Sequence, residues 1–170
     1  IDDTQNPAIT TCPPLVNFEG CDVAAITGLT FSAVSRSITA TQFTAAGGVV
    51  TDACGVVSYS YIDLQTGSCP ITVTRTFTVA DACGNTATCQ QTITVNDTQA
   101  PVINTCPASR TIEGCDASVI PGLPYSASRV SITRDEFIAA GGVATDACGI
   151  NLYSYIDIQS GSCPMTVTRT

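Results

Sequence analysis

The stretch that decides the fold is Ile71–Val79, which reads ITVTRTFTV. Threonine occupies every even position, and the apolar residues share the other face with Arg75. Because successive side chains of a β-strand point to opposite faces, this alternation predicts a strand with one buried and one solvated face. Arg75 is the exception on the buried face, and we expect it either to lie at a β-bulge or to pair with a carboxylate.

The segments around this strand also favour extended structure. Val56–Asp63 (VVSYSYID) alternates between two unlike faces, with Val57, Tyr59 and Tyr61 on one of them. Further extended segments are expected at Pro7–Cys12 as an edge strand, at Leu15–Cys21, and at Thr88–Val95 as the closing strand, with turns at Gln65–Gly67 and Asp81–Asn85. The sequence therefore predicts an all-β fold.

One short segment has a different character. Ala40–Ala46 lies between Thr39, a good N-cap residue, and the pair Gly47-Gly48, which is typical of a helix end. We expect a helix of one or two turns there.

The cysteine content points to an oxidising compartment. Ten of the 170 residues are cysteine, there is no histidine, and no CxxC spacing occurs, so the usual zinc and redox motifs are missing. Only 12% of the residues are charged and 6% are aromatic, which predicts small cores. Structural disulfides would compensate for such thin cores.

The negative charge of the chain limits the kinds of molecule that it is expected to bind. The net charge is −8, all six basic residues are arginine, and the sequence pI is about 4.1. Nucleic acid is therefore not expected as a partner. We also expect no membrane span, because no apolar run of about 18 residues occurs, and no lysine is available for an isopeptide cross-link.

The sequence contains an internal repeat. DTQNPAITTCP at Asp3 returns as DTQAPVINTCP at Asp97, 94 residues later, and 46 of the 74 aligned positions are identical. A period of this length corresponds to a whole small domain. We expect two domains, 1–96 and 97–170, in which residues 1–2 match the tail of a preceding copy. The second copy stops at the counterpart of Thr76, so we expect a piece of a longer array.

Two phrases in the chain resemble a known family. VTRTFTVADACGNTATCQQTITVNDTQAP and TCP are similar to the hyalin-repeat (HYR) pattern, in which a Cys-Pro near the first strand accompanies an Ala-Thr-Cys before the last. The whole period more closely resembles the repeats of giant Bacteroidota surface adhesins, a group that includes gliding-motility adhesins. This resemblance implies an immunoglobulin-like β-sandwich in each repeat.

The strand order of that family implies a disulfide pattern. Cys12 and Cys89 match the hyalin pair, which joins the first and last strands. By the pole of the domain at which each cysteine would then lie, the other pairs are Cys21–Cys69, Cys54–Cys83 and Cys115–Cys163. Cys106 and Cys148 would await partners beyond Thr170.

Acidic residues form a candidate calcium site. The junction VNDTQAP resembles the acidic linkers of cadherin-type repeats, and Asp2 and Asp3 would lie near the loops that hold Asp52 and Asp81. Hard oxygen ligands of this kind suit Ca²⁺ at the junctions between repeats. The alternative is that these aspartates cap turns and add solubility. We expect no other cofactor.

The function that follows is mechanical. We expect a rigid, disulfide-locked spacer in the stalk or filament of a long extracellular adhesin on a bacterial surface, serving cell adhesion or gliding motility. The expected partners are neighbouring repeats, and possible further partners are a glycan or a cell surface. The rival hypothesis is a polysaccharide- or cell-binding module that uses the Tyr59/Tyr61 strand or the insertion Ser32–Gly48. No catalytic residues are predicted, because the chain has neither histidine nor lysine.

Overall fold

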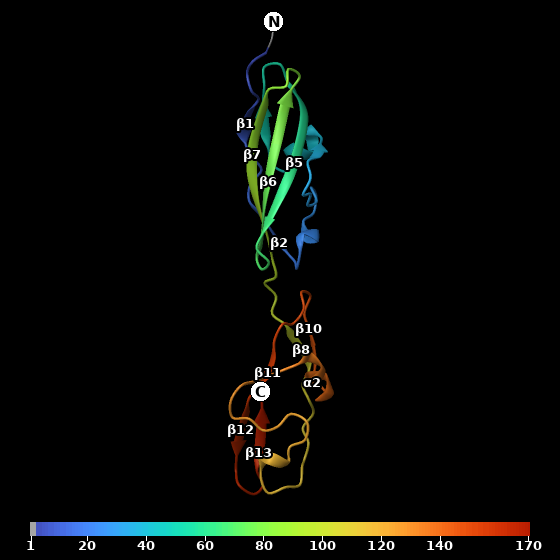
Figure 1. Ribbon diagram of the computed structural model, residues 1–170, viewed down its shortest axis with the longest axis vertical. Coiled ribbons are helices and arrows are strands. Elements are labelled where there is room, and N and C mark those ends of the chain that lie inside the picture. The colour runs from blue at the N-terminus through green and yellow to red at the C-terminus, as the bar shows by residue number, and fades with distance from the viewer. Residues whose placement is uncertain (1–2) are drawn as a thin grey trace. The chain divides into compact units, whose positions relative to one another are not determined.

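The computed structural model describes residues 3–170, which divide into two compact units. The first unit ends at Thr98 and the second comprises Gln99–Thr170, whereas the sequence placed the boundary between Asn96 and Asp97. β-Strands are the main regular elements of each unit (Figure 1). The all-β prediction is therefore confirmed.

A five-stranded sheet forms the larger layer of the first unit. Three long antiparallel strands, β5 (Val56–Thr66), β6 (Ile71–Asp81) and β7 (Thr86–Asn96), run side by side (Figure 1). Short β3 (Arg36–Ile38) pairs antiparallel with β5, and β2 (Val16–Glu19) pairs parallel with β7. The order is thus β2-β7-β6-β5-β3.

A second layer covers part of this sheet. β1 (Ala8–Thr11) pairs antiparallel with β4 (Val49–Thr51) in a separate two-stranded sheet. Ile9 and Val50 from these strands pack against the buried residues of the large sheet. The chain then passes from β1 to β2, and so from one sheet to the other, through Pro13-Pro14, which cannot donate backbone hydrogen bonds.

The burial of β6 follows the alternation in its sequence. The residues at odd positions are all buried, and the threonines at even positions are partly exposed. Two apolar clusters cover the buried face of the sheet, and each fully buried aliphatic or aromatic side chain contributes about 1.5–3 kcal/mol. One consists of Ile26, Ile71, Val73, Ile93 and Val95, and the other of Phe43, Tyr61 and Phe77.

One side chain does not lie on its expected face. Val57 was predicted to share one face of β5 with Tyr59 and Tyr61, but it is 63% exposed, whereas Tyr61 is buried. The β5–β6 register shifts between Val56 and Ser58, which is a β-bulge. An extra residue in one strand reverses the direction of the side chains before it, and periodicity alone cannot locate such a shift.

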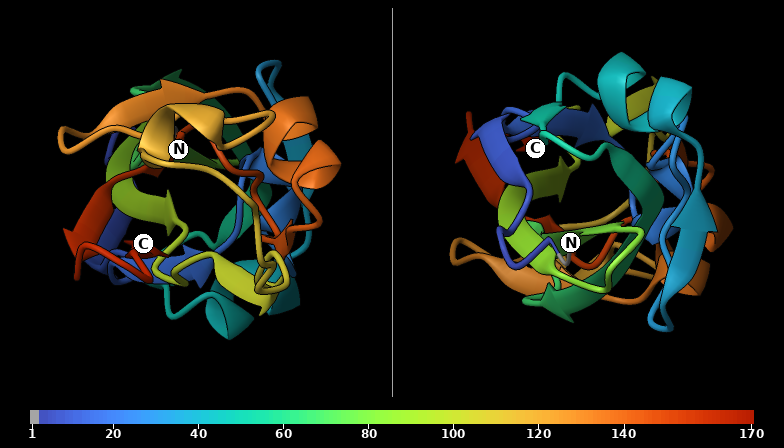
Figure 2. Two further views of the ribbon diagram at one scale, coloured as in Figure 1. Left: turned by 90° about the horizontal axis from the view of Figure 1, so that it is seen from below. Right: turned by 90° about the horizontal axis from the view of Figure 1, so that it is seen from above.

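The expected short helix is α1 (Ala40–Ala45), which lies at the periphery of the unit when it is viewed along the strands (Figure 2). Thr39 and Gln42 form a reciprocal capping box at its start, and Phe43 is its buried residue. Gly47, at φ +99°, ends the helix in the left-handed region. A Cβ on Gly48 would lie 2.4 Å from the Phe43 ring, so this glycine makes room for the ring.

Two explanations were expected for the buried Arg75, a β-bulge or a carboxylate partner, and the second is correct. It lies directly opposite Asp63 in the β5–β6 register, and two N–H groups of its guanidinium donate to the two Asp63 oxygens, each at 2.8 Å. Both residues are buried. The guanidinium also lies 4.3 Å from the centre of the Tyr61 ring.

This ion pair holds a long loop against the sheet. Arg75 Nη2 and the Tyr61 hydroxyl both donate to the carbonyl of Thr30, at 3.2 and 2.6 Å. The Ser32 N–H donates to Asp63, and Ser32 accepts from the Asp63 N–H. The loop also contains the 3₁₀ turn η1 (Val23–Ala25). The ion pair therefore positions residues that form no strand of their own.

The second unit repeats many elements of the first, but residues 110–113, the counterpart of β2, form no strand, and no counterpart of β7 is present. Its strands are β8 (Val102–Thr105), β9 (Val130–Ile132), β10 (Val143–Thr145), β11 (Tyr153–Tyr155), β12 (Asp157–Ser160) and β13 (Thr166–Arg169), with η2 (Ala117–Val119) and α2 (Arg134–Ala139). β8 pairs with β10, β9 with β11, and β12 with β13. All of these except the divided strand β11–β12 lie 94 residues after an element of the first unit, as the repeat requires.

The ion pair recurs with the same geometry. Arg169 donates to Asp157 at 2.8 Å and lies 4.2 Å from the Tyr155 ring centre. Its Nη2 donates to the carbonyls of Leu123 and Pro124. Hydrogen bonding to Arg169 lowers the pKa of Asp157 below its ordinary value. Both repeats thus use one device to anchor the same loop.

Replacing the buried arginine should destabilise the first unit strongly. Arg75→Met leaves the Asp63 charge buried without its partner, and we expect a loss of about 3–5 kcal/mol in the free energy of unfolding. Amide hydrogen exchange in β5 and β6 measures this loss for the first unit alone.

Two further variants give this test its controls. Asp63→Leu/Arg75→Met should cost less than the single change, because no charge is left buried. Arg134→Met, at an exposed position of α2, should change protection by less than about 0.5 kcal/mol. Equal losses in Arg75→Met and Arg134→Met would contradict the assigned role of the pair.

Candidate functional site

A disulfide joins the first and last strands of the first unit. Cys12 directly follows β1, Cys89 lies within β7, and their sulfurs are bonded at 2.06 Å with the Cα atoms 5.9 Å apart. This is the pair that the family resemblance implied. The bond spans a sequence separation of 77 residues, so most of the unit lies within one covalent ring.

The structure does not contain the other three pairs that we expected. Cys69 is a free thiol, so Cys21–Cys69 is not formed, and Cys54, Cys83, Cys115 and Cys163 are free as well. Cys106 is free and exposed. Cys148, expected to await a partner beyond Thr170, is disulfide-bonded, as is Cys21.

Two of the cysteines that were expected to form disulfides, Cys54 and Cys69, instead interact with nearby polar side chains. Hydrogen bonding to the Asp3 side chain, together with the charge of Asp3, raises the pKa of the Cys54 thiol. The Cys69 sulfur lies 3.7 Å from Oδ1 of Asn96. Neither contact could be foreseen from the spacing of the cysteines, because each depends on how a loop lies against a strand end.

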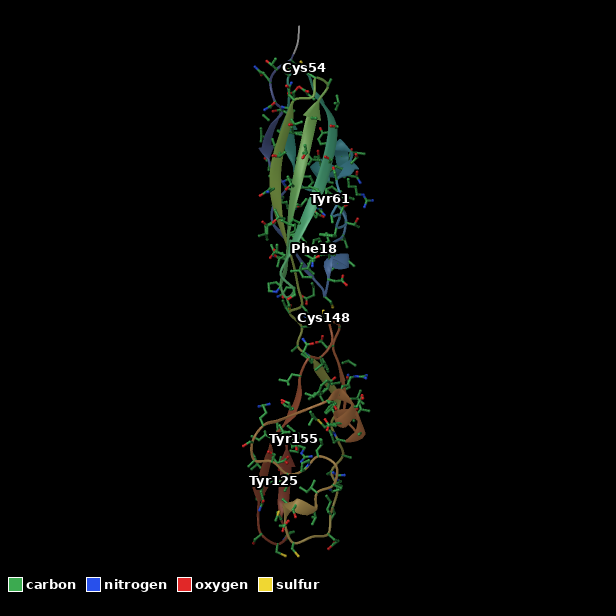
Figure 3. All side chains as sticks on the ribbon, in the orientation of Figure 1. Phe18, Cys54, Tyr61, Tyr125, Cys148 and Tyr155 are labelled. Atoms are coloured by element: carbon green, nitrogen blue, oxygen red, sulfur yellow. A yellow bond between two sulfur atoms is a disulfide. The ribbon has the colours of Figure 1, made fainter. Side chains whose placement is uncertain are left out.

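Three of the four predicted calcium ligands come together. Asp3, Asp52 and Asp81 each offer a carboxylate oxygen, and these oxygens lie within 4.8 Å of one another. The loops that carry them lie at the end of the first unit where Figure 3 labels Cys54. Asp2, the fourth predicted ligand, lies outside the described residues.

Asp81 is the fixed member of this acidic cluster. Its side chain is buried, and it accepts hydrogen bonds from the N–H groups of Cys83 and Asn85 and from the Asn85 side-chain amide. The bonds from Asn85 lower the pKa of Asp81 below its ordinary value. Asp81 is therefore held in its charged form.

Asp52 and Asp3, the other two members of the acidic cluster, accept fewer hydrogen bonds than Asp81 does. Asp52 Oδ1 accepts from the Cys54 N–H, and Asp3 Oδ1 accepts from the Gln5 N–H. Asp3 Oδ2 is buried and has no hydrogen-bond partner among the described residues. A buried carboxylate oxygen without a donor is costly, and a cation would relieve that cost.

The donor set fits a hard cation such as Ca²⁺. Calcium binds oxygens at about 2.3–2.6 Å, so ligands on opposite sides of one ion lie about 5 Å apart, close to the spread seen here. Calcium would neutralise three converging negative charges and tie the entering chain at Asp3 to two loops. It would supply structural cross-linking and no chemical step.

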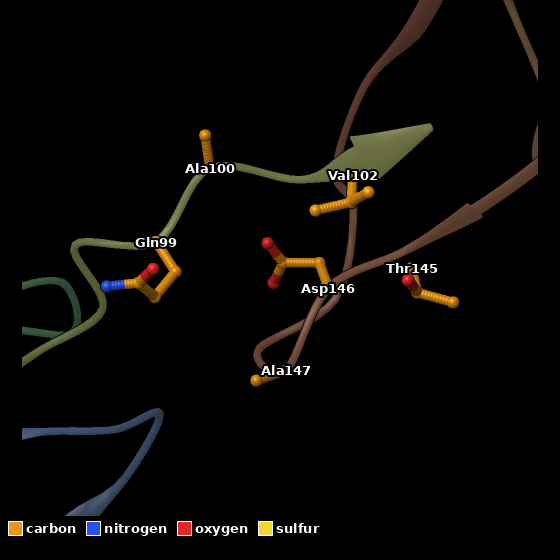
Figure 4. Close-up of a pocket in the computed structure, with 6 residues that line it drawn as sticks. All are labelled: Gln99, Ala100, Val102, Thr145, Asp146 and Ala147. Carbon is orange, nitrogen blue, oxygen red and sulfur yellow. The ribbon is translucent and has the colours of Figure 1, made fainter. Parts of the chain in front are cut away.

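The second unit has a hollow at the corresponding place. It has a volume of about 420 Å³, and its lining includes Asp146, the counterpart of Asp52 (Figure 4). Its other lining residues are Gln99, Ala100, Val102, Thr145 and Ala147. The counterparts of Asp81–Asn85 are not part of this chain, so no third carboxylate comes from that turn.

The aromatic residues of the rival binding hypothesis face inward. Tyr61 is 1% exposed, and Tyr59 is half-buried with its ring centre 5.6 Å from that of Phe43. A shallow hollow of about 180 Å³ beside Tyr61 is lined mostly by small and polar residues, among them Thr30 and Ser37. These rings offer no exposed stacking platform of the kind that sugars use.

Sequence reasoning missed Glu19 and Asn85. Glu19, at the end of β2, accepts from the N–H of Thr98 at 2.6 Å and from its hydroxyl at 2.8 Å. Asn85 donates from its side chain to the carbonyl of Asp3 at 2.9 Å. One residue thus holds the chain where it leaves the unit, and the other where it enters. The only signal in the sequence is the internal repeat. Glu19 recurs 94 residues later as Glu113, whereas this chain contains no counterpart of Asn85.

Comparison with known proteins identifies no relative: no family model, no curated protein and no solved structure matches the chain. Within residues 3–170, no helix has the length and apolar character needed to cross a membrane.

Removing the disulfide should weaken the first unit. Cys12→Ala/Cys89→Ala opens a ring of 77 residues, and we expect a loss of about 2–5 kcal/mol in the free energy of unfolding, chiefly because the unfolded chain gains freedom. Urea denaturation followed by hydrogen exchange in β7 measures it. Cys69→Ala, which removes an exposed thiol, should stay within about 0.5 kcal/mol. A loss in the double variant no larger than in Cys69→Ala would contradict this role.

Calcium should stabilise the first unit if the acidic cluster binds it. At a concentration 100 times the dissociation constant, a ligand of the native state adds about 2.7 kcal/mol, and the melting temperature rises accordingly. Scanning calorimetry with calcium and with a chelator measures the shift. Asp3→Asn/Asp52→Asn should abolish it, while Asp135→Asn on α2 should retain it. An unchanged melting temperature in the parent chain would remove the site.

Proposed function

We propose that this chain is a load-bearing segment of an extracellular stalk or filament, built from immunoglobulin-like repeats of a long surface adhesin. The observation that carries the proposal is the Cys12–Cys89 bond, which connects the strand by which the chain enters the first unit to the strand by which it leaves. Such a bond is typical of proteins in oxidising compartments outside the cytosol.

The bond supplies a short covalent route through the unit. Tension that enters near Asp3 passes along β1 to Cys12, crosses to Cys89, and continues along β7 to Asn96. Residues between Cys12 and Cys89 lie off this route. The core therefore need not carry the pulling force for the unit to stay connected and short.

When the disulfide is reduced and β2 enters the tensioned path, the pairing of β2 with β7 is arranged for shear. β2 runs parallel to β7, from Val16 opposite Ile93 to Glu19 opposite Asn96. Pulling the start of one strand against the end of its parallel neighbour loads their hydrogen bonds together and not one after another. The two hydrogen bonds that Thr98 donates to Glu19 extend the attachment between these two segments beyond the end of β7.

The composition agrees with a surface role. The net charge of −8 keeps extended molecules apart and soluble. The repeat and its resemblance to adhesin modules support the same reading, with further copies as neighbours. The arrangement of a two-stranded layer over a five-stranded sheet, with the chain changing sheets between β1 and β2, supports the immunoglobulin-like assignment.

Single-molecule stretching tests the proposal. With handles at the two chain ends, the oxidised protein should not release the residues between Cys12 and Cys89. Reduction should add a lengthening of roughly 250–280 Å, because each freed residue extends by up to about 3.3–3.6 Å.

The matched control separates the disulfide from other effects of the reductant. In a background in which the other bonded cysteines, Cys21 and Cys148, are replaced by alanine, Cys12→Ala/Cys89→Ala should give the long extension with and without reductant. Cys69→Ala in the same background should behave like its parent. A full-length extension of the oxidised parent at low force would overturn the load-bearing assignment.

A further inference from the structure

Two exposed thiols lie next to the paired ends of β5 and β6, at the end of the first unit where Figure 3 labels Cys54. Cys54 comes two residues before β5 begins, and Cys83 comes two residues after β6 ends. The two strands are antiparallel, and Val56, the first residue of β5, is paired with Asp81, the last residue of β6. Continuing this register by two residues on each strand places Cys54 opposite Cys83.

Opposite positions of an antiparallel pair suit a disulfide. Their Cα atoms lie about 4.5–5.5 Å apart, and a disulfide needs a Cα separation of about 4.4–6.8 Å. Beyond the paired strand ends, the chain forms a bend at Cys54 and a turn at Cys83. Because neither cysteine belongs to a strand, small movements of these segments can join the two sulfurs without breaking the β5–β6 ladder.

The backbones of both cysteines are held by the acidic cluster. The Cys54 N–H donates to Oδ1 of Asp52 at 2.8 Å, and the Cys83 N–H donates to Oδ1 of Asp81 at 2.9 Å. Carboxylate oxygens of these two aspartates lie within 4.8 Å of each other. The two segments that carry the thiols therefore lie side by side, which agrees with the continued register.

The side chains of the two cysteines are also close to each other. Hydrogen bonding to the Asp3 side chain is the main cause of the raised pKa of the Cys54 thiol, and Cys83 makes a smaller contribution in the same direction. A contribution of this kind requires the two thiols to be near neighbours.

No other free thiol among the described residues of the first unit can take the place of either cysteine. Cys69 lies two residues before β6 begins, and the 11 residues of β6 span roughly 35 Å, so Cys69 is at the far end of the strand. Cys12 and Cys89 are bonded to each other, and Cys21 is disulfide-bonded as well.

We propose that Cys54 and Cys83 form a redox latch: they are thiols in this structure, and oxidation joins them in a disulfide within the first unit. The family resemblance implied a permanent bond between them, whereas the structure contains both as thiols. The latch needs neither a neighbouring repeat nor a pulling force, so it is independent of the proposed stalk.

The latch would close the end of the unit that holds Asp3. It would join the segment that carries Asp52 to the turn Asp81–Asn85, whose Asn85 side chain donates to the carbonyl of Asp3. Because the same two segments carry two of the three carboxylates of the acidic cluster, oxidation would also fix the spacing between Asp52 and Asp81. Redox conditions would thus set how firmly this end of the unit is held.

The latch would close by thiol–disulfide exchange with a small disulfide such as glutathione disulfide. One thiolate of the pair attacks the oxidant and displaces one glutathione, forming a mixed disulfide. The other thiolate attacks the protein sulfur of this mixed disulfide and displaces the second glutathione. The two cysteines lose two electrons and two protons, and the oxidant is reduced to two thiols.

Oxidation of the full chain tests the latch. The protein is equilibrated with mixtures of glutathione and glutathione disulfide at low protein concentration, remaining thiols are alkylated, and the unreduced chain is cut before its aspartates and analysed by mass spectrometry. This cleavage separates Cys54, on residues 52–62, from Cys69, on residues 63–80. We expect a cross-link between residues 52–62 and 81–96 that grows with the oxidant, while the alkylated forms of Cys54 and Cys83 decline together.

Hydrogen exchange measures what the latch does to the fold. In the oxidised chain, amides at the start of β5 and at the end of β6 should exchange roughly 30 to 1,000 times more slowly than in the thiol form, which is the effect of a typical disulfide. Amides of α2 in the second unit should exchange at the same rate in both forms.

Single substitutions supply the controls. Cys54→Ser and Cys83→Ser should each abolish the cross-link and the slower exchange, whereas Cys69→Ser should retain both. The bond between Cys12 and Cys89 shows in each variant that the first unit has folded. The latch would be overturned if Cys54 and Cys83 stay alkylated in glutathione disulfide alone, carry separate glutathiones, or bond to Cys69. None of these outcomes affects the stretching test, which starts from the thiol form of this pair and depends on Cys12 and Cys89.

Discussion

A buried ion pair between Asp63 and Arg75 constrains the rest of the first unit. The two residues lie directly opposite each other on neighbouring strands, both are buried, and each charge has its partner at 2.8 Å. A slip of the β5–β6 register would separate them and leave two charges in an apolar layer, which costs far more than any single contact in this lean core contributes. The pair thus specifies one register among several that the alternating sequence would otherwise allow.

The same pair organises residues that form no strands. The loop from Gly20 to Ser35 has little regular structure beyond η1, yet Thr30 and Ser32 are bound to the pair through their backbone groups. The second unit repeats this with Asp157, Arg169 and the loop around Pro124. There Arg169 is 25% exposed at its side chain, whereas Arg75 is 3% exposed, because β6 is covered by β7 on its far side and β13 pairs with β12 alone.

The sequence predicted what depends on periodicity and missed what depends on loops. Alternation in Ile71–Val79 predicted the buried face of β6 and marked Arg75 as an exception, to be explained either by a β-bulge or by a carboxylate partner. Thr39 and Gly47 predicted α1 because capping is a local property. The bulge after Val56 was not predictable, because one extra residue leaves no compositional trace.

The convergence of Asp3, Asp52 and Asp81 was expected. The hydrogen bonds of Glu19 to Thr98 and of Asn85 to Asp3 were not, because they depend on where the chain ends of the unit lie in three dimensions. Three of the expected disulfides presupposed that cysteines at one pole pair within a copy, and the free thiols do not follow that rule.

The parallel pairing of β2 with β7 also bears on how such a molecule is made. The residues that pair are about 77 positions apart in sequence, and Val16 meets Ile93 only after the final strand has formed. Ladders between such distant segments form slowly, because the intervening chain must be ordered first. The first unit therefore stays open during synthesis until its last strand is available, and its apolar face remains exposed to proteases and to mispairing for that time.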